Sequence, residues 1–322
     1  MNDPVDLVEI WRGGRLESVH RGHAVIVDDT GEIVDARGDP GHITFPRSSA
    51  KMIQALPLVE SGVADRFGLT PEQLALACAS HSGAAIHTDR VRPWLAELGY
   101  TDDAFACGPQ WPSDVPARDG LIKSDATPCR YHNNCSGKHC GFLTMVKANG
   151  WGPDYVAIDH PLQIAIKARF EEITGEDSPG WGIDGCSAPN HAVSMIGMAR
   201  AMATFAAAKD GAMVRLRDAM MAHPDLVSNT DRACNDLMRA GAGKVAVKTG
   251  AEGYFIAILP ERKLGVALKI MDGTTRASES AMAAILIRLG VVSADDPRVK
   301  RYANPEITNF AGLVTGEMRA VI

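Results

Sequence analysis

Phe45-Pro46-Arg47-Ser48-Ser49-Ala50-Lys51 is the most informative stretch of this 322-residue chain. Apolar residues at helical spacing follow it, and the proline stands at a favoured helix start, so the sequence predicts a helix that begins near Ser48. Residues three apart lie on one face of a helix, and the side chains of Ser48 and Lys51 are therefore predicted to meet. A lysine that burial or a neighbouring cation keeps neutral can take the proton of a serine hydroxyl. Ser48 and Lys51 are thus a candidate nucleophile and base.

Lys248-Thr249-Gly250 is a second informative stretch, at the end of a predicted strand that opens the C-terminal run of strands. A lysine there, beside a cleft, would lower the pKa of Lys51 and would donate to an anionic substrate or a proton relay. An SxxK early in the chain and a KTG late, with helices between them, is the layout of the penicillin-recognising serine hydrolases. The third element of that layout, a Ser-x-Asn in the helical part, is missing from the sequence in recognisable form.

Ser80-His81-Ser82-Gly83 is the best substitute for that third element. It follows the apolar helical segment 74–78 and ends in glycine, which places it in a loop at the end of a helix. A hydroxyl in such a loop can reach a cleft, so Ser80 is a candidate to pass a proton between Lys248 and a leaving group. A role as a turn serine stays open.

The remaining sequence predicts the elements around these stretches. Short β-rich runs separated by Gly-Gly and Asp-Thr-Gly predict an antiparallel meander in residues 8–34, and strands return in 244–270 before a helix over 275–289. The region between is mainly helical. We therefore expect a single catalytic unit, residues 1–322, of the α/β (α+β) class, with an antiparallel sheet flanked by helices plus a helical subdomain. Residues 1–65 and 243–322 would form the part with the sheet, and residues 66–242 the helical part.

Charge and composition restrict the partners and the compartment. The 33 Lys and Arg residues against 39 Asp and Glu give a formal charge of −6, which opposes nucleic acid as a partner. No apolar run approaches the roughly 20 residues of a membrane helix, and the first residues lack the basic start of a secretory signal. We expect a cytoplasmic protein that binds neither nucleic acid nor a membrane, with its seven cysteines reduced.

Residues 132–141, His-Asn-Asn-Cys-Ser-Gly-Lys-His-Cys-Gly, are the densest cluster of reactive side chains. Thiolates and imidazoles are the ligands that zinc prefers, and Cys186 lies in a similarly polar, Gly-rich loop. The residue chemistry alone indicates a zinc site that uses His139 or Cys140, while a reduced cluster that stabilises a loop stays open. Asp184, flanked by small residues in the Cys186 loop, is a candidate carboxylate for a substrate ammonium group, or a turn cap.

Four separated segments, in order, resemble the rhizobial-type (class 3) L-asparaginases, also called the asparaginase II family. They are residues 45–51, 78–83, 133–139 and 184–186, and the resemblance covers nearly the whole chain. It implies a fold similar to the serine β-lactamases and penicillin-binding proteins, a homodimer, and hydrolysis of L-asparagine to L-aspartate and ammonia.

The resemblance also implies roles for individual residues. The catalytic residues would form two serine-lysine pairs, Ser48 with Lys51 and Ser80 with Lys248, with Ser48 as the nucleophile.

One zinc ion per subunit would be bound by Cys135, Lys138 and Cys186, with water as the fourth ligand, and Lys138 thus takes the place that residue chemistry gave to His139 or Cys140. Arg47, His139 and Asp184 would contact the substrate.

Two other interpretations of the sequence compete with an L-asparaginase. One is a penicillin-recognising serine hydrolase or peptidase, but the substrates of those enzymes lie outside the cytoplasm. The other is a noncatalytic zinc-binding protein in which the Ser48–Lys51 spacing is accidental.

Overall fold

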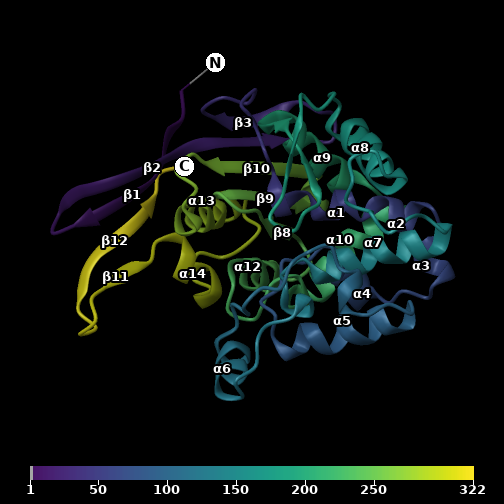
Figure 1. Ribbon diagram of the computed structural model, residues 1–322. Coiled ribbons are helices and arrows are strands. Elements are labelled where there is room, and N and C mark those ends of the chain that lie inside the picture. The colour runs from purple at the N-terminus through teal and green to yellow at the C-terminus, as the bar shows by residue number, and fades with distance from the viewer. Residues whose placement is uncertain (1–2) are drawn as a thin grey trace.

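An eight-stranded antiparallel sheet organises the computed structural model, which describes residues 3–322 (Figure 1). Its hydrogen-bonded order is β11-β12-β1-β2-β10-β9-β8, and β3 pairs with β2 beside that path. The strands are β1 (Val5–Arg12), β2 (Arg15–Val27), β3 (Ile33–Arg37), β8 (Ala246–Thr249), β9 (Tyr254–Leu259), β10 (Leu264–Ile270), β11 (Glu306–Thr308) and β12 (Val314–Ala320). The two ends of the chain therefore build one sheet, as the sequence predicts.

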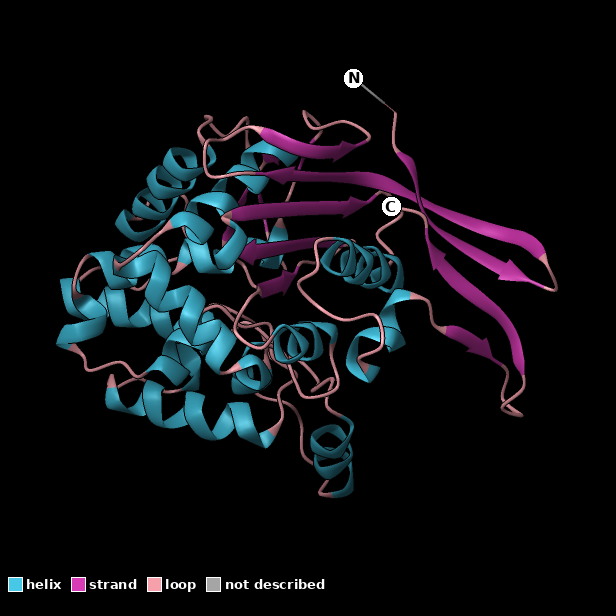
Figure 2. Ribbon diagram, turned by 180° about the vertical axis from the view of Figure 1, so that it is seen from behind, coloured by secondary structure: helices cyan, strands magenta, loops and turns pink. Residues whose placement is uncertain are grey.

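The long strand β2 joins two different parts of the sheet. Its first half is mostly exposed and pairs with β1, whereas Ala24–Val27 is buried and pairs with β10 and β3. The hairpins β1–β2 and β11–β12 consequently project as an arm from the body of the molecule, away from most of the helices (Figure 2). Burial thus separates a solvated arm from the part of the sheet that carries the core.

Helices make up most of the chain between β3 and β8, and two more follow β10. They are α1 (Lys51–Gln54), α2 (Leu56–Glu60), α3 (Val63–Arg66), α4 (Pro71–Ala77), α5 (Ala85–Glu97), α6 (Val115–Lys123), α7 (Ser136–Asn149), α8 (Pro161–Thr174), α9 (Met195–Ala207), α10 (Gly211–Ala222), α11 (Pro224–Val227), α12 (Ala233–Gly241), α13 (Thr275–Arg288) and α14 (Pro297–Ala303). Short 3₁₀ turns are η1 (Arg47–Ala50), η2 (Asp102–Ala104), η3 (Arg130–His132) and η4 (Pro260–Arg262). Among the described residues, no helix is both long and apolar enough to cross a membrane.

Two small hairpin-like pairs complete the fold beside the large sheet. They are β4 (Ile43–Thr44) with β7 (Val193–Ser194), and β5 (Trp181–Ile183) with β6 (Pro189–His191). The first pair ties the segment before Ser48 to the start of α9, and the second presents residues 184–188 as its connecting loop. Both pairs therefore position segments that the sequence singles out for function.

The contact between α9 and β10 depends on Gly265. A side-chain carbon at this position would overlap the Ala199 carbonyl oxygen and the Ala203 nitrogen of α9. Because glycine has no Cβ, the helix backbone can lie directly on the strand, and the apolar face of α9 is buried there. The division of the chain into two subdomains, which the sequence predicts, stays a prediction; α9, from the predicted helical part, packs on the sheet itself.

From the sequence, a helix is expected from Ser48 onward that Pro57 kinks or ends; the structure has the break beside Pro57 and also a 3₁₀ turn at the start. In place of one helix, the chain forms η1, then α1, then α2 with Pro57 in its first turn. A proline lacks the N–H that a continuous helix needs and favours a new helix start. Ser48 and Lys51 therefore lie on two successive short elements.

Two further differences concern residues 132–141 and the C-terminus. The reactive cluster was expected in a loop, but Ser136 starts α7, so Lys138 and His139 lie in the first turn of a buried helix. The sequence also does not predict β11 and β12, which are largely exposed. Exposed strands lack the apolar alternation on which such a prediction rests.

Gly265→Ala is expected to lower the free energy of unfolding by about 1–3 kcal/mol, because the added methyl group overpacks the contact with α9. Urea denaturation measures the change. The control is Gly120→Ala in the exposed helix α6, where an added carbon meets no atom within 4 Å. Equal stability of the two variants would contradict the role given to Gly265.

Candidate active site

The hydroxyl of Ser80 is the meeting point of two buried lysines. Lys51 Nζ donates to Ser80 Oγ over 3.0 Å, and Lys248 Nζ donates to the same oxygen over 2.8 Å. Both lysines are almost fully buried, at 1% and 0% exposure. The loop that carries Ser80 follows α4, and its backbone is fixed because Ser80 N donates to Val227 O. The structure therefore brings together three of the four predicted catalytic residues in one hydrogen-bonded group.

Lys248 has the altered acidity that a base near neutral pH requires. Burial lowers its pKa to about 7, and the charges of Lys51 and Arg232 add to this shift, whereas Cys234 opposes it. The sequence predicts Lys248 as a cation that acts on Lys51; in the structure, the pKa of Lys248 itself is lowered. A neutral amine has a lone pair, so Lys248 can then accept a proton from Ser80.

Lys51 is held by three acceptors on different segments. Besides Ser80 Oγ, it donates to the Ala79 carbonyl and, over 3.1 Å, to Cys135 Sγ. The hydrogen bond expected between Ser48 and Lys51 is not among the side-chain contacts of the described residues. Lys51 therefore joins the two-lysine group to the segment that starts α7.

Ser48 is more accessible to solvent than Ser80. It is partly exposed, whereas Ser80 is only 8% exposed. The preceding residue, Arg47, has a left-handed backbone with φ of 53°. Such a conformation is costly for a residue other than glycine and recurs at functional sites. It turns the chain sharply just before the candidate nucleophile.

Arg47 and Asp184 form an ion pair next to Ser48. The Arg47 guanidinium donates to Asp184 Oδ1 over 2.7 Å, and the Arg47 backbone N–H donates to Asn190 Oδ1 over 3.2 Å. The two charged side chains are 27% and 14% exposed. Asp184 thus has an arginine partner and also accepts from the backbone of Gly185. The predicted substrate contacts Arg47 and Asp184 are brought together with opposite charges in reach of solvent.

Cys135, Lys138 and Cys186 converge behind this pair. Lys138 Nζ donates to Cys186 Sγ over 2.9 Å. A hydrogen bond from Cys135, together with the charge of Lys138, lowers the pKa of Cys186 well below its usual value. Burial opposes the charge on Lys138, but the Cys186 thiolate outweighs burial and raises the pKa of Lys138. The three ligands implied by the resemblance are therefore in contact, although they come from α7 and the β5–β6 loop.

The alternative ligands His139 and Cys140 are placed differently. Cys140 is fully buried and its Sγ lies 3.8 Å from the Val91 carbonyl. His139 Nδ1 lies 2.8 Å from the Tyr155 hydroxyl, and its Nε2 has no hydrogen-bond partner. Of the two ligands that residue chemistry favours, Cys140 is directed toward Val91, away from Cys186, and the ligand set itself stays a prediction. The fully buried His139 can reach a ligand or a substrate only through Nε2.

The donor set suits a zinc ion in its chemistry. Two thiol sulfurs and one amine nitrogen converge, and an unpartnered buried imidazole nitrogen lies on the next residue of the same helix. Among residues 3–322, no group of three or more His, Cys, Asp or Glu side chains is placed to hold a metal. A zinc site here therefore depends on Lys138 as a ligand, and the amine must lose its proton to bind.

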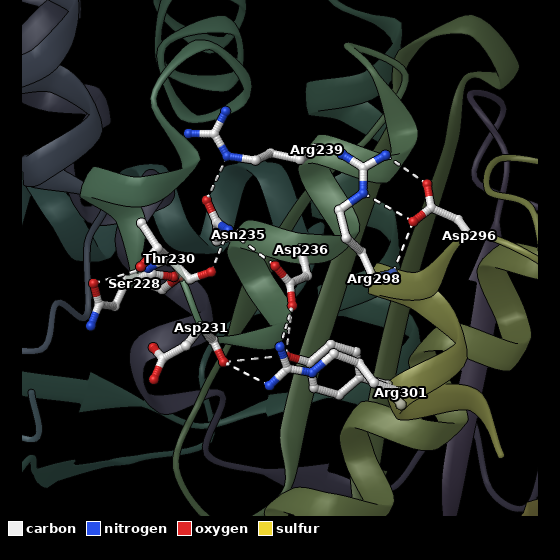
Figure 3. A network of polar contacts seen from close by, with 11 residues as sticks. Ser228, Thr230, Asp231, Asn235, Asp236, Arg239, Asp296, Arg298 and Arg301 are labelled. Carbon is white, nitrogen blue, oxygen red and sulfur yellow. Dashed lines mark hydrogen bonds and ion pairs between the residues drawn. The ribbon is translucent and has the colours of Figure 1, made fainter. Parts of the chain in front are cut away.

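A polar network joins α12, which packs on β8, to α14 (Figure 3). Thr249 N donates to Cys234 Sγ on α12 over 3.3 Å, and Cys234 is 1% exposed. Asp236, two residues further along α12, accepts from the Tyr302 hydroxyl and pairs with Arg301, both on α14. Because α12 is fixed by these buried contacts, the strand end with Lys248 is held from both sides.

A serine oxygen shared by two buried lysine amines places the chain among the serine hydrolases that use lysine as the base. The sequence model described as L-asparaginase II matches residues 8–320, and the chain belongs to that family. It is an amidohydrolase, an L-asparaginase that hydrolyses L-asparagine to L-aspartate and ammonia. The family expected from the four sequence segments is confirmed.

Other comparisons give more distant similarities. A β-lactamase from Mycobacterium bovis is 13% identical with a TM-score of 0.47, over 84% of this chain and 95% of that chain. An octameric penicillin-binding protein homologue from Pyrococcus abyssi is 13% identical with a TM-score of 0.36, over 94% of this chain and 84% of that chain. Curated protein sequences give no significant match.

Several residues of the site have no signal in the sequence. Asn190 holds the backbone of Arg47, Tyr155 holds His139, and Ser49 donates to the Lys248 carbonyl over 2.9 Å. Each acts through a contact between segments far apart in the chain. Only Ser49 lies inside a motif, the Ser48–Lys51 stretch. The spacing of that motif gives a role to its first and last residues and none to the hydroxyl of Ser49.

The rate of asparagine hydrolysis is expected to rise through pH 7, falling by about tenfold for each pH unit below it, because protonated Lys248 cannot accept a proton. Below its pKa of about 7, Lys248 carries its charge, and above that pH it is neutral. The measurement is kcat/KM from pH 5.5 to 9. Lys248→Arg, which stays cationic, should lose this ascending limb.

Lys269→Arg is the matched control, since Lys269 is also a buried lysine, on β10, whose pKa burial lowers. It should keep the limb. A pH profile that is flat in the wild type, or unchanged in Lys248→Arg, would contradict the assignment.

Proposed function

We propose that Ser48 is the nucleophile and that Ser80 relays protons between the substrate and the lysines. Ser48 is the more accessible of the two serines and follows directly on the Arg47–Asp184 pair. Ser80 is buried, and two amines occupy its oxygen. The single observation that carries this assignment is the Ser80 oxygen between Lys51 and Lys248.

The Arg47–Asp184 pair suits the amino acid end of asparagine. That end carries an α-carboxylate and an α-ammonium group, and a guanidinium and a carboxylate are their complementary partners. Arg47 would exchange Asp184 for the α-carboxylate of the substrate, and Asp184 would exchange Arg47 for the α-ammonium group. Binding therefore leaves no charge unpaired, which a buried site requires. His139, through its free Nε2, is a third proposed contact.

The reaction proceeds by acyl transfer in two halves. Ser48 Oγ attacks the side-chain carbonyl carbon, and its proton passes into the two-lysine group. The C–N bond breaks as the same group, through Ser80, protonates the leaving nitrogen, so ammonia departs and an ester to Ser48 remains. Water then attacks the ester carbon and gives a proton to the neutral Lys248 through Ser80. The bond from that carbon to Ser48 Oγ breaks, the proton returns from Lys248 through Ser80 to Ser48 Oγ, and the product leaves as aspartic acid, which ionises in solvent. The amines end in their original protonation state.

We further propose one zinc ion per subunit at Cys135, Lys138 and Cys186. The support is the contact of two thiols and an amine, with the pKa of Cys186 lowered toward the thiolate that binds a metal. A bound zinc ion would supply a positive charge and Lewis acidity beside the Asp184 loop. Without it, the same three side chains order the loop by hydrogen bonds.

The protein is also proposed to be a cytoplasmic homodimer that binds no nucleic acid. The formal charge of −6 supports the last point, and the family resemblance supports the dimer. The seven cysteines, all free, suit a reducing compartment.

Ser48→Ala is expected to abolish acyl transfer, with ammonia release from L-asparagine lower by at least about 10³-fold, because no alternative nucleophile has its position. Ser80→Ala should slow turnover but still form the ester. Acid quenching during turnover, followed by peptide mass analysis, locates the added aspartyl group. An aspartyl group on Ser80 in the wild type would reverse the two roles.

A β-lactam chromogen, tested beside asparagine, separates the competing penicillin-recognising hydrolase. Chromogen cleavage without ammonia release would favour that enzyme, and no turnover of either compound, with zinc bound, would favour a noncatalytic zinc-binding protein.

Cys186→Ser is expected to reduce bound zinc from about one ion per chain to nearly none, because hydroxyl oxygen is a poor zinc ligand compared with thiolate. Metal analysis of the purified protein measures the ratio. Cys140→Ser is the control, since Cys140 is equally buried but bonds toward Val91. A full zinc content in Cys186→Ser would contradict the proposed ligand set.

A further inference from the structure

Ser49 is a fully buried hydroxyl inside the SxxK stretch that the mechanism above does not use. It is 0% exposed, and its Oγ donates to the carbonyl oxygen of Lys248 over 2.9 Å. Its backbone N–H donates to Pro46 O over 3.1 Å, which fixes the turn η1 on which Ser49 lies. One side chain thus connects the segment with Ser48 and Lys51 to the strand with Lys248.

Gly250 brings the same two segments close from the side of β8. A Cβ at Gly250 would lie 2.5 Å from Pro46 O and 3.0 Å from Ser49 Oγ. No side chain can therefore occupy this position without moving η1 away from the strand. The contact is both tight and polar, and Ser49 is its hydrogen-bonding group.

The spacing across this contact determines whether both lysines reach Ser80. Lys51 follows η1 by one residue and Lys248 lies on β8, yet their amines meet on one oxygen of a third segment. The two bonds of 3.0 and 2.8 Å leave only a few tenths of an ångström before either becomes too long. A shift of η1 relative to β8 would therefore break the two-lysine group.

We propose that the Ser49 hydroxyl is a positioning residue for amide hydrolysis, which holds the Ser48–Lys51 segment at the distance from β8 at which Lys51 and Lys248 share Ser80. This inference rests on the proposed catalytic roles of these side chains. Ser49 touches no reacting atom in that mechanism. It acts by keeping η1 and β8, which are far apart in the sequence, at a fixed distance from each other.

The predicted defect is one of turnover and not of substrate binding. Arg47 begins η1, but it has contacts of its own that do not involve Ser49: its N–H donates to Asn190 Oδ1 and its guanidinium to Asp184 Oδ1. Ser49→Ala is expected to lower kcat by about tenfold or more, because misplaced catalytic groups are costly to the rate. KM should stay within about twofold, as for an interaction that matters mainly in the transition state.

Ser280→Ala is a matched control for the structural cost. Ser280, on α13, is also 0% exposed, and its Oγ donates over 2.9 Å to the carbonyl of Ala303 at the end of α14, with no bond to a lysine or serine of the site. Ser49→Ala and Ser280→Ala each lose one buried hydrogen bond from a hydroxyl to a backbone carbonyl, and the two bonds have the same length of 2.9 Å. Similar losses in the melting temperature are expected, whereas only Ser49→Ala should lose kcat.

Two more variants test the spacing independently. Ser49→Thr keeps the hydroxyl and should recover most of the lost kcat. Gly250→Ala keeps the Ser49 bond donor but forces the segments apart, and it should lower kcat with little change in KM. If Ser49→Ala does not fold, the kcat values of Ser49→Thr and Gly250→Ala still test whether the spacing between η1 and β8 controls turnover.

The experiment is steady-state ammonia release from L-asparagine by the wild type and the four variants, with melting temperatures measured on the same samples. Wild-type kcat in Ser49→Ala, or in Gly250→Ala, would overturn the inference. A loss of kcat in Ser280→Ala as large as in Ser49→Ala would do so as well. An inactive wild type would instead refute the proposed function, which keeps the two failures distinct.

Discussion

The hydroxyl of Ser80, which accepts hydrogen bonds from Lys51 and Lys248, is the constraint on which the rest of the structure depends. Each lysine is buried, and a buried amine that lacks a polar partner would cost several kcal/mol. The two amines can share one oxygen only if three segments meet at a distance of about 3 Å. The sheet supplies the rigid strand β8, and the turn η1 and the end of α4 dock against it. The fold thus brings the site together from both ends and the middle of the chain.

Much of this arrangement follows from the sequence, because local patterns identify each segment. The β-rich runs at both ends predict the shared sheet, and the SxxK and KTG stretches predict which residues face the site. The sequence does not contain the distances between segments. It predicts that Ser48 and Lys51 meet, but it gives no sign that Lys51 donates to Ser80, Cys135 and the Ala79 carbonyl on other segments.

Residues that act by close packing are the hardest to predict. Gly265 and Gly250 matter because of the backbone that lies against them, and Ser49 matters because of one carbonyl group on a distant strand. Their identities fit many roles, and no spacing distinguishes them from ordinary glycines and serines. The choice between Lys138 and Cys140 has the same origin, since zinc chemistry favours the thiol but the helix turns it toward Val91.

Lys51 also links the hydrolytic group to the proposed metal ligands. It donates to Ser80 Oγ on one side and to Cys135 Sγ on the other, and Cys135 in turn bonds to Cys186 next to the Asp184 loop. A chain of direct contacts therefore runs from the two-lysine group to the proposed site for the substrate's amino acid end. Because Lys51, Cys135 and Cys186 are buried and each is bonded to the next, a displacement of one changes the geometry of its neighbours. The two-lysine group and the proposed metal ligands are in this way parts of one network, whereas the Arg47–Asp184 pair has its own anchor on Asn190.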